Sequence, residues 1–420
     1  MPSDHIIAFA NLGNTCFMNA VLQALRLTPG FLSAILEDFE EYDLHEPYAP
    51  LIRSLHDLYK EILATPSGTL IKPRSFLEAL IRSVETGKKI KMEEDKVSKE
   101  RLTLKDALLE EEKRLDLEEA QLNVKEDIPK RLKLEEDRLQ LEIKKEKLKV
   151  VDVFKYKYGD QMDIDEFLIR LLDQFHECIS RRVKMDIEPI PSLMDNPIHI
   201  QQIQALNAWK DRYKSHYSSI IHDFHHQTQL RITCNTCGYM SSQYGSTPIV
   251  QARISPSATT LIDCFRYTFN TNIIDDYDCP TCLSKRVATQ TYRFSKFPKN
   301  LIIMISRFET SLTKNEQLIG VDLERLDLRA FLGFPSPFSD EPPIYQTYAV
   351  IHHHGHSLHG GHYTMMGRQG HDWYHYNDGN VTRSRASNVM TKEAYMLFLT
   401  HKSAYSRFET VEYPRYQMEA

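Results

Sequence analysis

The sequence of 420 residues predicts an α+β protein whose helical and strand-forming segments occupy different parts of the chain. Apolar residues recur at helical spacing in residues 17–87, which is typical of amphipathic helices. From about residue 227, short β-branched apolar runs replace that spacing and indicate strands. Between these parts, residues 88–150 are mostly charged and lack the apolar content to share a globular core. We therefore predict an α+β fold with a charged helical insertion.

The composition, 41% hydrophobic and 26% charged, is that of an ordinary soluble protein. A formal net charge of -6 provides no basic surface for a nucleic acid, and no apolar run approaches the ~20 residues that cross a bilayer. The N-terminus lacks the pattern of a signal peptide. Seven cysteines with two Cys-x-x-Cys pairs favour a reducing compartment over a disulfide framework. We expect an intracellular protein, cytoplasmic or nuclear or both, with neither nucleic acid nor membrane as partner.

A polar turn with Gly13 leads into the first predicted helix, which Thr15 or Asn14 can cap. Cys16 then lies in the first helical turn, where the helix dipole and unpaired N–H groups favour a thiolate. A thiolate is the nucleophilic form of cysteine. Taken alone, a single cysteine here is more often a small buried apolar residue. The case for a nucleophile therefore depends on residues far downstream.

The charged insertion carries two sets of leucines at intervals of seven, separated by Pro129. The sets are Leu108, Leu115 and Leu122, and Leu134, Leu141 and Leu148. This spacing is a heptad signal and indicates a helical hairpin or a coiled-coil arm. A solvated single helix is the alternative, because each run covers only about three heptads.

After the insertion, an apolar stripe that starts at Phe167 predicts a helix. Asp163 and Glu166 lie near its N-terminus, where carboxylates are favoured and most often only balance the helix dipole. A second helix is predicted over residues 200–217. Strands are predicted at 230–233, 249–254 and 265–269.

Two Cys-x-x-Cys pairs, Cys234 with Cys237 and Cys279 with Cys282, offer the four thiolates of a tetrahedral structural zinc site. The gap between the pairs exceeds that of a compact zinc ribbon, so we expect two separate hairpins clipped by one Zn²⁺. With four thiolates the site has no open position for catalysis. The other two downstream cysteines, at positions 178 and 264, are predicted to lie in the core.

The last third is strand-rich, with strands predicted at 301–305, 348–351 and 373–376. The histidine- and glycine-rich run 352–364 is predicted to form a loop that a substrate backbone can approach closely. A cysteine protease needs a thiolate, an imidazole, a group that orients the imidazole, and donors for the oxyanion. Cys16, His362 and either Asn377 or Asp378 supply the first three. The Asn11 amide and the Cys16 N–H supply the donors.

Several segments, in this order, resemble the ubiquitin-specific proteases. They are residues 11–19 with 22–25, 161–167, 208–209, the paired cysteines, 297–308, 359–364 and 373–378. The resemblance covers nearly the whole chain except the charged insertion. Met162, Ile164 and Phe17 depart from the family pattern, but none of them removes a catalytic group.

The resemblance implies a papain-like hand of helical thumb, β-rich palm and zinc-clipped fingers. The thumb would comprise residues 1–87 and 151–226, the fingers 227–297 with the four-cysteine zinc site, and the palm 298–420. Residues 88–150 would be the coiled-coil insertion. We expect it to be a partner-binding or regulatory arm, because exposed rows of leucine side chains are typical of surfaces that another protein buries.

The same resemblance implies a deubiquitinating thiol hydrolase that cleaves the peptide or isopeptide bond after the C-terminal glycine of ubiquitin. Cys16 would be the nucleophile that forms a thioester, His362 the general base, and Asn11 an oxyanion donor. Asn377 falls at the third triad position, with Asp378 as the alternative. Ubiquitin and ubiquitinated proteins would be the partners.

The resemblance also implies residues that bind the substrate. Asp163 and Glu166 match acids that pair with arginines of the ubiquitin tail, and Gly360 and Gly361 match the loop that closes on its glycines. Three other functions are weighed against this one: a non-catalytic ubiquitin-binding scaffold, a hydrolase of a ubiquitin-like modifier, and a zinc-ribbon nucleic-acid binder. The intact catalytic residues disfavour the scaffold, and the acidic balance disfavours the nucleic-acid binder.

Overall fold

The structure is a computed structural model that describes residues 5–31, 49–83, 162–187, 191–193, 195–308, 313–357 and 360–402. The chain divides into two compact units, residues 1–77 with 159–420 and residues 78–158. The predicted insertion 88–150, with its leucine heptads, lies outside the described residues. The elements described below belong to the first unit.

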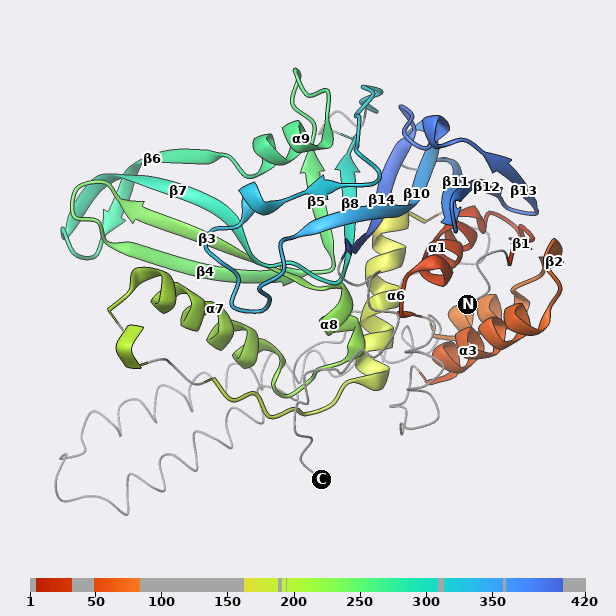
Figure 1. Cartoon of the computed structure of the whole chain (residues 1–420), viewed down its shortest axis with the longest axis horizontal. Helices are drawn as coiled ribbons and strands as arrows, with labels where there is room; N and C mark the ends of the chain where they lie inside the picture. Colours follow the sequence, from red (N-terminus) through yellow and green to blue (C-terminus); the bar gives the residue numbers. More distant parts are fainter. Residues whose placement is uncertain are drawn as a thin grey trace, which may run out of the picture. The chain divides into compact units, whose positions relative to one another are not determined.

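A large mixed sheet forms the centre of this unit, with strand order β13-β12-β11-β10-β14-β8-β5 and β9 paired with β10 (Figure 1). Neighbouring strands are antiparallel except β5 and β8, which are parallel. Its strands are β5 (Ile249–Arg253), β8 (Asn300–Ser306), β9 (Leu326–Asp327), β10 (Ile344–Ser357), β11 (Gly360–Gln369), β12 (Asp372–Asn377), β13 (Asn380–Ser384) and β14 (Ala394–His401). The apolar runs that predicted strands at 249–254, 301–305, 348–351 and 373–376 coincide with β5, β8, β10 and β12, which confirms those predictions.

Two helices, α1 (Cys16–Leu27) and α8 (Ser219–Phe224), pack against strands of this sheet. α6 (Ile164–Ile179) packs against both of them, and α3 (Ala49–Ala64) packs against α6. α1 packs against β11, where Gly367 permits close approach because a Cβ there would lie 2.5 Å from the Leu27 side chain. α6 packs against α1, and the Phe17 and Phe167 rings meet edge to face with centroids 5.0 Å apart. No helix among the described residues is long and apolar enough to span a bilayer.

The opposite face of the sheet packs against α9 (Leu261–Thr268). Residues 265–269 were predicted to form a strand, and this prediction is wrong because 265–268 lie in α9. A capping box formed by Thr260 and Asp263 starts the helix, and Leu261, Cys264 and Phe265 bury its inner side. The capping signal therefore outweighs the β-forming composition of this short segment.

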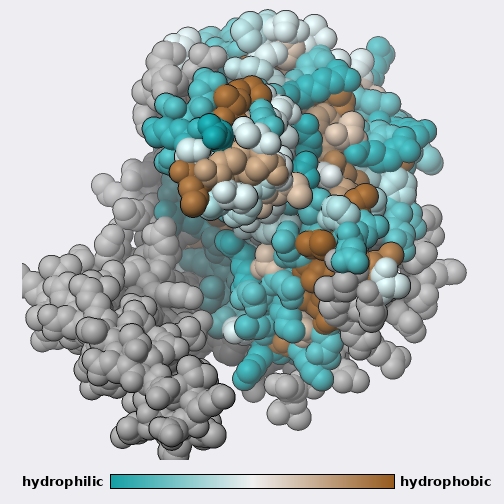
Figure 2. All heavy atoms as spheres, turned by 90° about the vertical axis from the view of Figure 1, so that its left-hand side faces the viewer, coloured by the Kyte–Doolittle hydropathy of each residue, from teal (hydrophilic) through white to brown (hydrophobic). Residues whose placement is uncertain are grey.

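A second sheet, with order β4-β3-β7-β6, extends to the left in Figure 1. Its strands are β3 (His226–Cys234), β4 (Met240–Thr247), β6 (Thr271–Cys279) and β7 (Ser284–Lys296). The strand predicted at 230–233 is thus confirmed. Figure 2 views this end of the molecule and shows apolar side chains scattered among hydrophilic ones. Exposed apolar residues of this sheet and its turns include Met240, Ile273, Leu283 and Val287.

Shorter elements complete the unit. β1 (Ile7–Phe9) and β2 (Thr69–Ile71) form a parallel pair, and η1 (Pro191–Leu193), η2 (Arg329–Phe331) and η3 (Ala386–Asn388) are 3₁₀ turns. The helix predicted over 200–217 is α7 (Pro197–Tyr213), which starts earlier because Asn196 caps it and Pro197 occupies its first turn. Cys178 and Cys264 are buried in the core, as predicted.

The histidine-rich run 352–364 is not the predicted loop. β10 continues through Ser357 and β11 begins at Gly360, so most of the run belongs to two paired strands. His352 and His353 are buried, and the main chain of β10 pairs with both β11 and β14. Pairing with β11 as far as Ser357 therefore keeps this polar sequence extended.

Candidate active site

The N-terminal turn presents Cys16 as the first residue of α1. The turn is closed by Asn11, whose Oδ1 accepts hydrogen bonds from the N–H groups of Gly13 at 3.0 Å and Thr15 at 3.2 Å. Gly13 and Asn14 have positive φ angles of 107° and 52°, a region that glycine and asparagine tolerate best. The position of the cysteine at the helix start is therefore as predicted.

Thr15, one of the two residues predicted to cap α1, occupies its N-cap position. Its side chain, however, makes no capping hydrogen bond to the helix. Its Oγ1 instead accepts a hydrogen bond from the Leu12 N–H at 2.9 Å and donates one to Asn11 Oδ1 at 3.3 Å. The hydroxyl therefore stabilises the turn that precedes the helix.

A small pocket brings the two ends of the chain together at Cys16. It is lined by Phe9, Cys16, Asn19, Ala20, Gln23, Tyr363, Tyr376 and Asp378. Tyr363 directly follows His362, and Asp378 directly follows Asn377. The residues next to the predicted base and the predicted orienting group thus share a pocket with the predicted nucleophile, which is 3% exposed.

His362 and Asn377 face each other from neighbouring strands β11 and β12. The His362 Nε2 atom lies 2.8 Å from Asn377 Oδ1. Because an amide oxygen can only accept, this contact places the proton on Nε2 and leaves Nδ1 available as a base. Of the two residues that could orient His362, the structure places Asn377 in contact with it.

Asp378 contacts the N-terminal turn and α1 instead of His362. Its Oδ2 accepts a hydrogen bond from Asn11 Nδ2 at 2.9 Å, and its Oδ1 accepts one from Asn19 Nδ2 at 2.8 Å. One carboxylate therefore fixes two amide side chains, one in the N-terminal turn and one in α1. Asn19 was not a sequence candidate, although a polar residue on the buried side of α1, three positions after Cys16, is a signal that could have identified it.

The acids at the start of α6 differ in their surroundings. Asp163 is the N-cap residue, and its Oδ1 is buried with no hydrogen-bond partner among the described residues. Burial raises the pKa of Asp163 to about 8, and the carboxyl of Asp165 contributes to the same increase. Glu166 is more exposed and already forms an ion pair with Arg170 at 2.9 Å. Asp165, which the sequence analysis missed, is thus part of the acidic group together with Asp163.

Gly360 and Gly361 start β11 and directly precede His362. A Cβ on Gly361 would lie 2.5 Å from both His353 Nε2 and the carbonyl oxygen of His354, so only glycine fits this position. A Cβ on Gly360 would meet nothing within 4 Å. Steric contacts within the protein therefore require glycine at position 361 but not at position 360.

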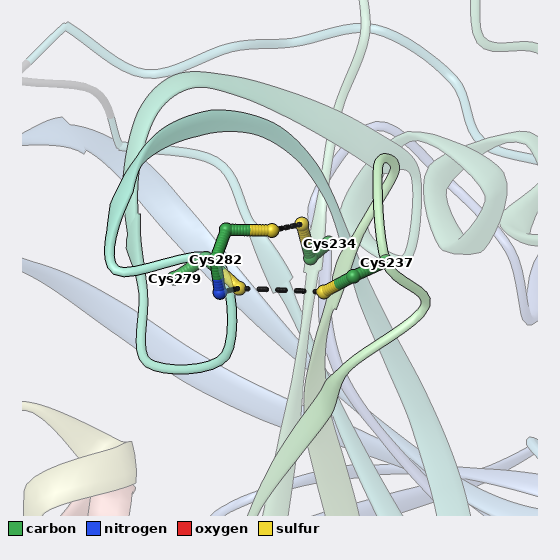
Figure 3. Close-up of side chains that lie close together, drawn as sticks. All are labelled: Cys234, Cys237, Cys279 and Cys282. Carbon is green, nitrogen blue, oxygen red and sulfur yellow. Dashed lines mark hydrogen bonds between the residues drawn. The ribbon is translucent and has the colours of Figure 1, made fainter.

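The four predicted zinc ligands converge at the tips of two hairpins (Figure 3). Their ligand atoms all lie within 4.8 Å of one another, with Cys237 Sγ 3.5 Å from Cys279 Sγ and Cys234 Sγ 4.0 Å from Cys282 Sγ. Tetrahedral Zn–S bonds of about 2.3 Å separate two sulfurs by about 3.8 Å, so these distances fit one Zn²⁺. Main-chain N–H groups of Cys237 and Thr236 help to lower the pKa of Cys234 to about 6, which favours a thiolate.

The two cysteine pairs adopt the same backbone turn. Gly238 N–H bonds to the Cys234 carbonyl and Leu283 N–H bonds to the Cys279 carbonyl, both at 2.9 Å. The residue after each pair has a positive φ, 73° for Gly238 and 51° for Leu283. The cysteines at 234, 237, 279 and 282 are thus held by a repeated turn suited to a metal.

Comparisons with known proteins agree with this geometry. A sequence model of the family described as ubiquitin carboxyl-terminal hydrolase matches residues 7–399. Ubiquitin carboxyl-terminal hydrolase 2 of Gallus gallus is 31% identical over 265 residues, which is 59% of this chain and 70% of that protein. The Homo sapiens protein of the same name is 25% identical over 416 residues, 94% of this chain and 55% of that protein.

Ubiquitin carboxyl-terminal hydrolase 21 of Homo sapiens is 30% identical over 263 residues, which is 57% of this chain and 45% of that protein. This chain therefore spans only about half the length of several relatives that it matches. The family match nevertheless extends from β1 to β14 and includes both the N-terminal turn and the β11–β12 hairpin. The chain belongs to the ubiquitin carboxyl-terminal hydrolases, in the ubiquitin-specific protease family of cysteine peptidases.

Proposed function

We propose that this protein hydrolyses the peptide or isopeptide bond after the C-terminal glycine of ubiquitin through a thioester on Cys16. The observation that carries the proposal is the shared pocket, in which Cys16 meets the residues adjacent to His362 and Asn377. Elements from the two ends of the chain combine there into a nucleophile, a base and an orienting group.

In this mechanism His362 first takes the proton of the Cys16 thiol, and the resulting thiolate attacks the carbonyl carbon of the terminal glycine. His362 then gives this proton to the leaving amine as the C–N bond breaks. Water then attacks the thioester, with His362 taking its proton, and releases ubiquitin as a carboxylate and Cys16 as a thiol. Asn377 Oδ1 holds the His362 Nε2–H, so the imidazole keeps the required tautomer.

Oxyanion stabilisation is assigned to the Asn11 side-chain amide and the Cys16 N–H. Asn11 Nδ2 carries two hydrogens, and one of them is donated to Asp378. In the proposal the other hydrogen is donated to the oxyanion. In this assignment Asp378 fixes the amide, while Asn377 alone orients the imidazole.

Recognition of the ubiquitin tail is assigned to Asp163 and to the segment of Gly360 and Gly361. The buried Oδ1 of Asp163 has no partner among the described residues, and a guanidinium of the tail would satisfy it once the carboxyl has lost its proton. Glu166 would contribute as part of the Glu166–Arg170 pair. Gly360, where a Cβ would meet no protein atom within 4 Å, leaves open space next to His362 that the substrate backbone would occupy.

Zn²⁺ would be held by Cys234, Cys237, Cys279 and Cys282 and would clip the ends of the two hairpins. We propose that the four-stranded sheet is the fingers of the papain-like hand, with residues 1–87 and 151–226 as thumb and 298–420 as palm. A reducing intracellular compartment would keep these cysteines free for the metal.

The charged segment 88–150 is proposed to bind a protein partner and not to take part in catalysis. Removal of residues 90–149 should then leave hydrolysis of a minimal ubiquitin substrate within about twofold of the full chain. A folded deletion variant that has lost this activity would contradict the proposal.

The decisive experiment is labelling with ubiquitin that carries a C-terminal electrophile, compared between the wild type and Cys16→Ser. We expect a covalent adduct with the wild type and none with the variant. Labelling that persists in Cys16→Ser would remove Cys16 as the nucleophile. Absence of labelling of the folded wild type would favour a non-catalytic scaffold, and a faster reaction with a ubiquitin-like electrophile would favour that modifier as substrate.

A further inference from the structure

Imidazole rings stack beside His362 on the β10–β11 pair. His354 lies directly opposite His362 in the strand register, and their ring centroids are 6.4 Å apart with an angle of 30° between the planes. His352, on the same face of β10, stacks on His354 at 6.2 Å with the same angle. Both separations fall within the range of offset-stacked rings.

The His354 ring is fixed by its own hydrogen bond. Its Nε2 lies 2.9 Å from the Oγ1 of Thr364, a buried residue of β11. Thr364 is two positions after His362, so both side chains point to the same face of the sheet. His362 is fixed from the other side through Asn377 in β12. The two imidazoles are therefore anchored separately and lie next to each other with their planes 30° apart.

We propose that His354 is a positioning residue for His362, because its anchored ring occupies the space beside the imidazole while Asn377 holds the imidazole edge. This inference rests on the proposed role of His362 as the base. Without the supporting ring, His362 can rotate about its χ angles and leave Asn377, so that fewer molecules hold the imidazole ready for proton transfer.

The surroundings of His354 favour its neutral form. The groups that act on it are His352 of β10, His362 of β11, His375 of β12, Lys314 of the segment before β9, and Glu393 directly before β14. Burial lowers the pKa of His354, Glu393 opposes this effect, and protonated His362, Lys314 and His375 lower the pKa further. Two stacked imidazoles therefore resist becoming cations together.

The test compares two substitutions of His354 with a matched control on the same strand. His354→Ala removes the ring, whereas His354→Phe keeps a ring but cannot titrate. The control is His356→Ala, which removes the same side chain two residues further along β10, where it is 90% exposed and pairs with Glu316.

We expect His354→Ala to lower kcat on a fluorogenic ubiquitin substrate about five- to tenfold with KM within about twofold. His354→Phe should restore kcat to within about twofold of the wild type. His356→Ala should not change kcat.

An unchanged kcat in a folded His354→Ala variant would overturn the inference, as would an equal loss in His354→Ala and His354→Phe. A second readout does not require activity. The proton on His362 Nε2 should exchange with solvent faster in His354→Ala than in His356→Ala, measured by NMR of the histidine rings. If that difference is seen while the wild type hydrolyses nothing, the proposed function fails and the positioning role stands.

Discussion

Asp378 illustrates how neighbouring polar residues acquire different tasks. Asn377 ends β12 and faces His362, whereas Asp378 lies in the following turn with a φ of 48° and faces Asn11 and Asn19. The sequence named both as candidates but could not separate them. The direction of each side chain depends on where the strand stops, and that boundary is set by the pairing of β12 with β13.

We predict that Asp378→Asn lowers kcat about 100-fold with little change in KM. A carboxylate accepts from both amides, but an asparagine offers one oxygen and turns an NH₂ group toward the other amide. Steady-state kinetics on a fluorogenic ubiquitin amide would measure this loss. The control is Asp372→Asn at the opposite end of β12, where the carboxylate pairs with exposed Arg383. Equal activity of Asp378→Asn and wild type would show that catalysis does not depend on the hydrogen bond by which Asp378 orients the Asn11 amide.

Asp163 should make substrate binding sensitive to pH. Its pKa is about 8, raised from 3.8 by burial and by Asp165, so near neutral pH the free protein retains a proton that a guanidinium must displace. We expect KM to rise as pH falls from about 8.5 to 6.5, by up to about tenfold per pH unit. Asp165→Asn, which removes the neighbouring charge, should shift this rise to lower pH. A KM independent of pH over this range in the wild type would contradict the assignment of the tail to Asp163.

At the scale of elements, hydrophobic periodicity located four of the eight strands of the large sheet and misread two segments. Residues 265–269 have strand-like composition, yet the capping box of Thr260 and Asp263 starts a helix just before them. The histidine run was predicted to be a loop because of its glycines. It is extended because β10 pairs with β11 through Ser357, and strand pairing leaves no local signal in the sequence.

The two cysteine turns allow a reciprocal test of backbone strain. A leucine with positive φ costs about 1 kcal/mol relative to glycine, and Leu283 occupies such a position with its side chain 88% exposed. We predict that Leu283→Gly stabilises the zinc-loaded protein by about 0.5–1 kcal/mol. Gly238→Ala, where a Cβ would meet nothing within 4 Å, should destabilise it by about 1 kcal/mol.

Denaturant unfolding of the zinc-loaded variants would measure both changes. Ser284→Gly serves as the control, because it introduces a glycine at the next position, the first residue of β7, where no positive φ is required. Stabilisation by Ser284→Gly equal to that of Leu283→Gly would show that strain at position 283 is not the cause.

Removal of zinc should loosen the ends of the hairpins and leave the large sheet intact. The metal would join the turn after β3 to the turn after β6, while the other ends of these strands are held by ladder hydrogen bonds to β7. We expect chelation to speed amide hydrogen exchange near Cys237 and Cys282 by about tenfold or more, with no change in β8 or β14. Hydrogen-exchange mass spectrometry would measure this, and uniform acceleration across both sheets would indicate that zinc holds the whole unit together.

At the scale of the whole molecule, the N-terminal segment and the last strands form one structure. Arg26 donates to the Tyr376 hydroxyl at 3.4 Å and to the His5 carbonyl at 3.2 Å, and Thr28 shares a hydrogen bond of 2.7 Å with Tyr348. Local sequence patterns predicted α1 and β12 separately. They could not predict that the two are in contact, because residues that are hundreds of positions apart meet only after the sheet has formed.

Buried histidines should make this assembled structure sensitive to acid. Burial lowers the pKa of several of them, to about 3 for His226 and about 4 for His176, His352 and His353. In the unfolded chain these groups titrate near 6.5, so below that pH the unfolded state binds more protons than the folded state. Their contribution to stability is therefore complete above about pH 6.5 and declines as pH falls toward 4.

Each such group should lower the free energy of unfolding by up to about 1.4 kcal/mol per pH unit in this range. His226 offers the clearest test, because its ring packs on Phe294 and its Nδ1 is buried with no partner among the described residues. His226→Phe keeps an aromatic ring there and removes the titration, so the slope of unfolding free energy against pH should decrease between pH 6 and 4.5. His356→Phe, at an exposed position, should leave the slope unchanged, and an unchanged slope in His226→Phe would show that His226 is not among the groups that drive acid unfolding.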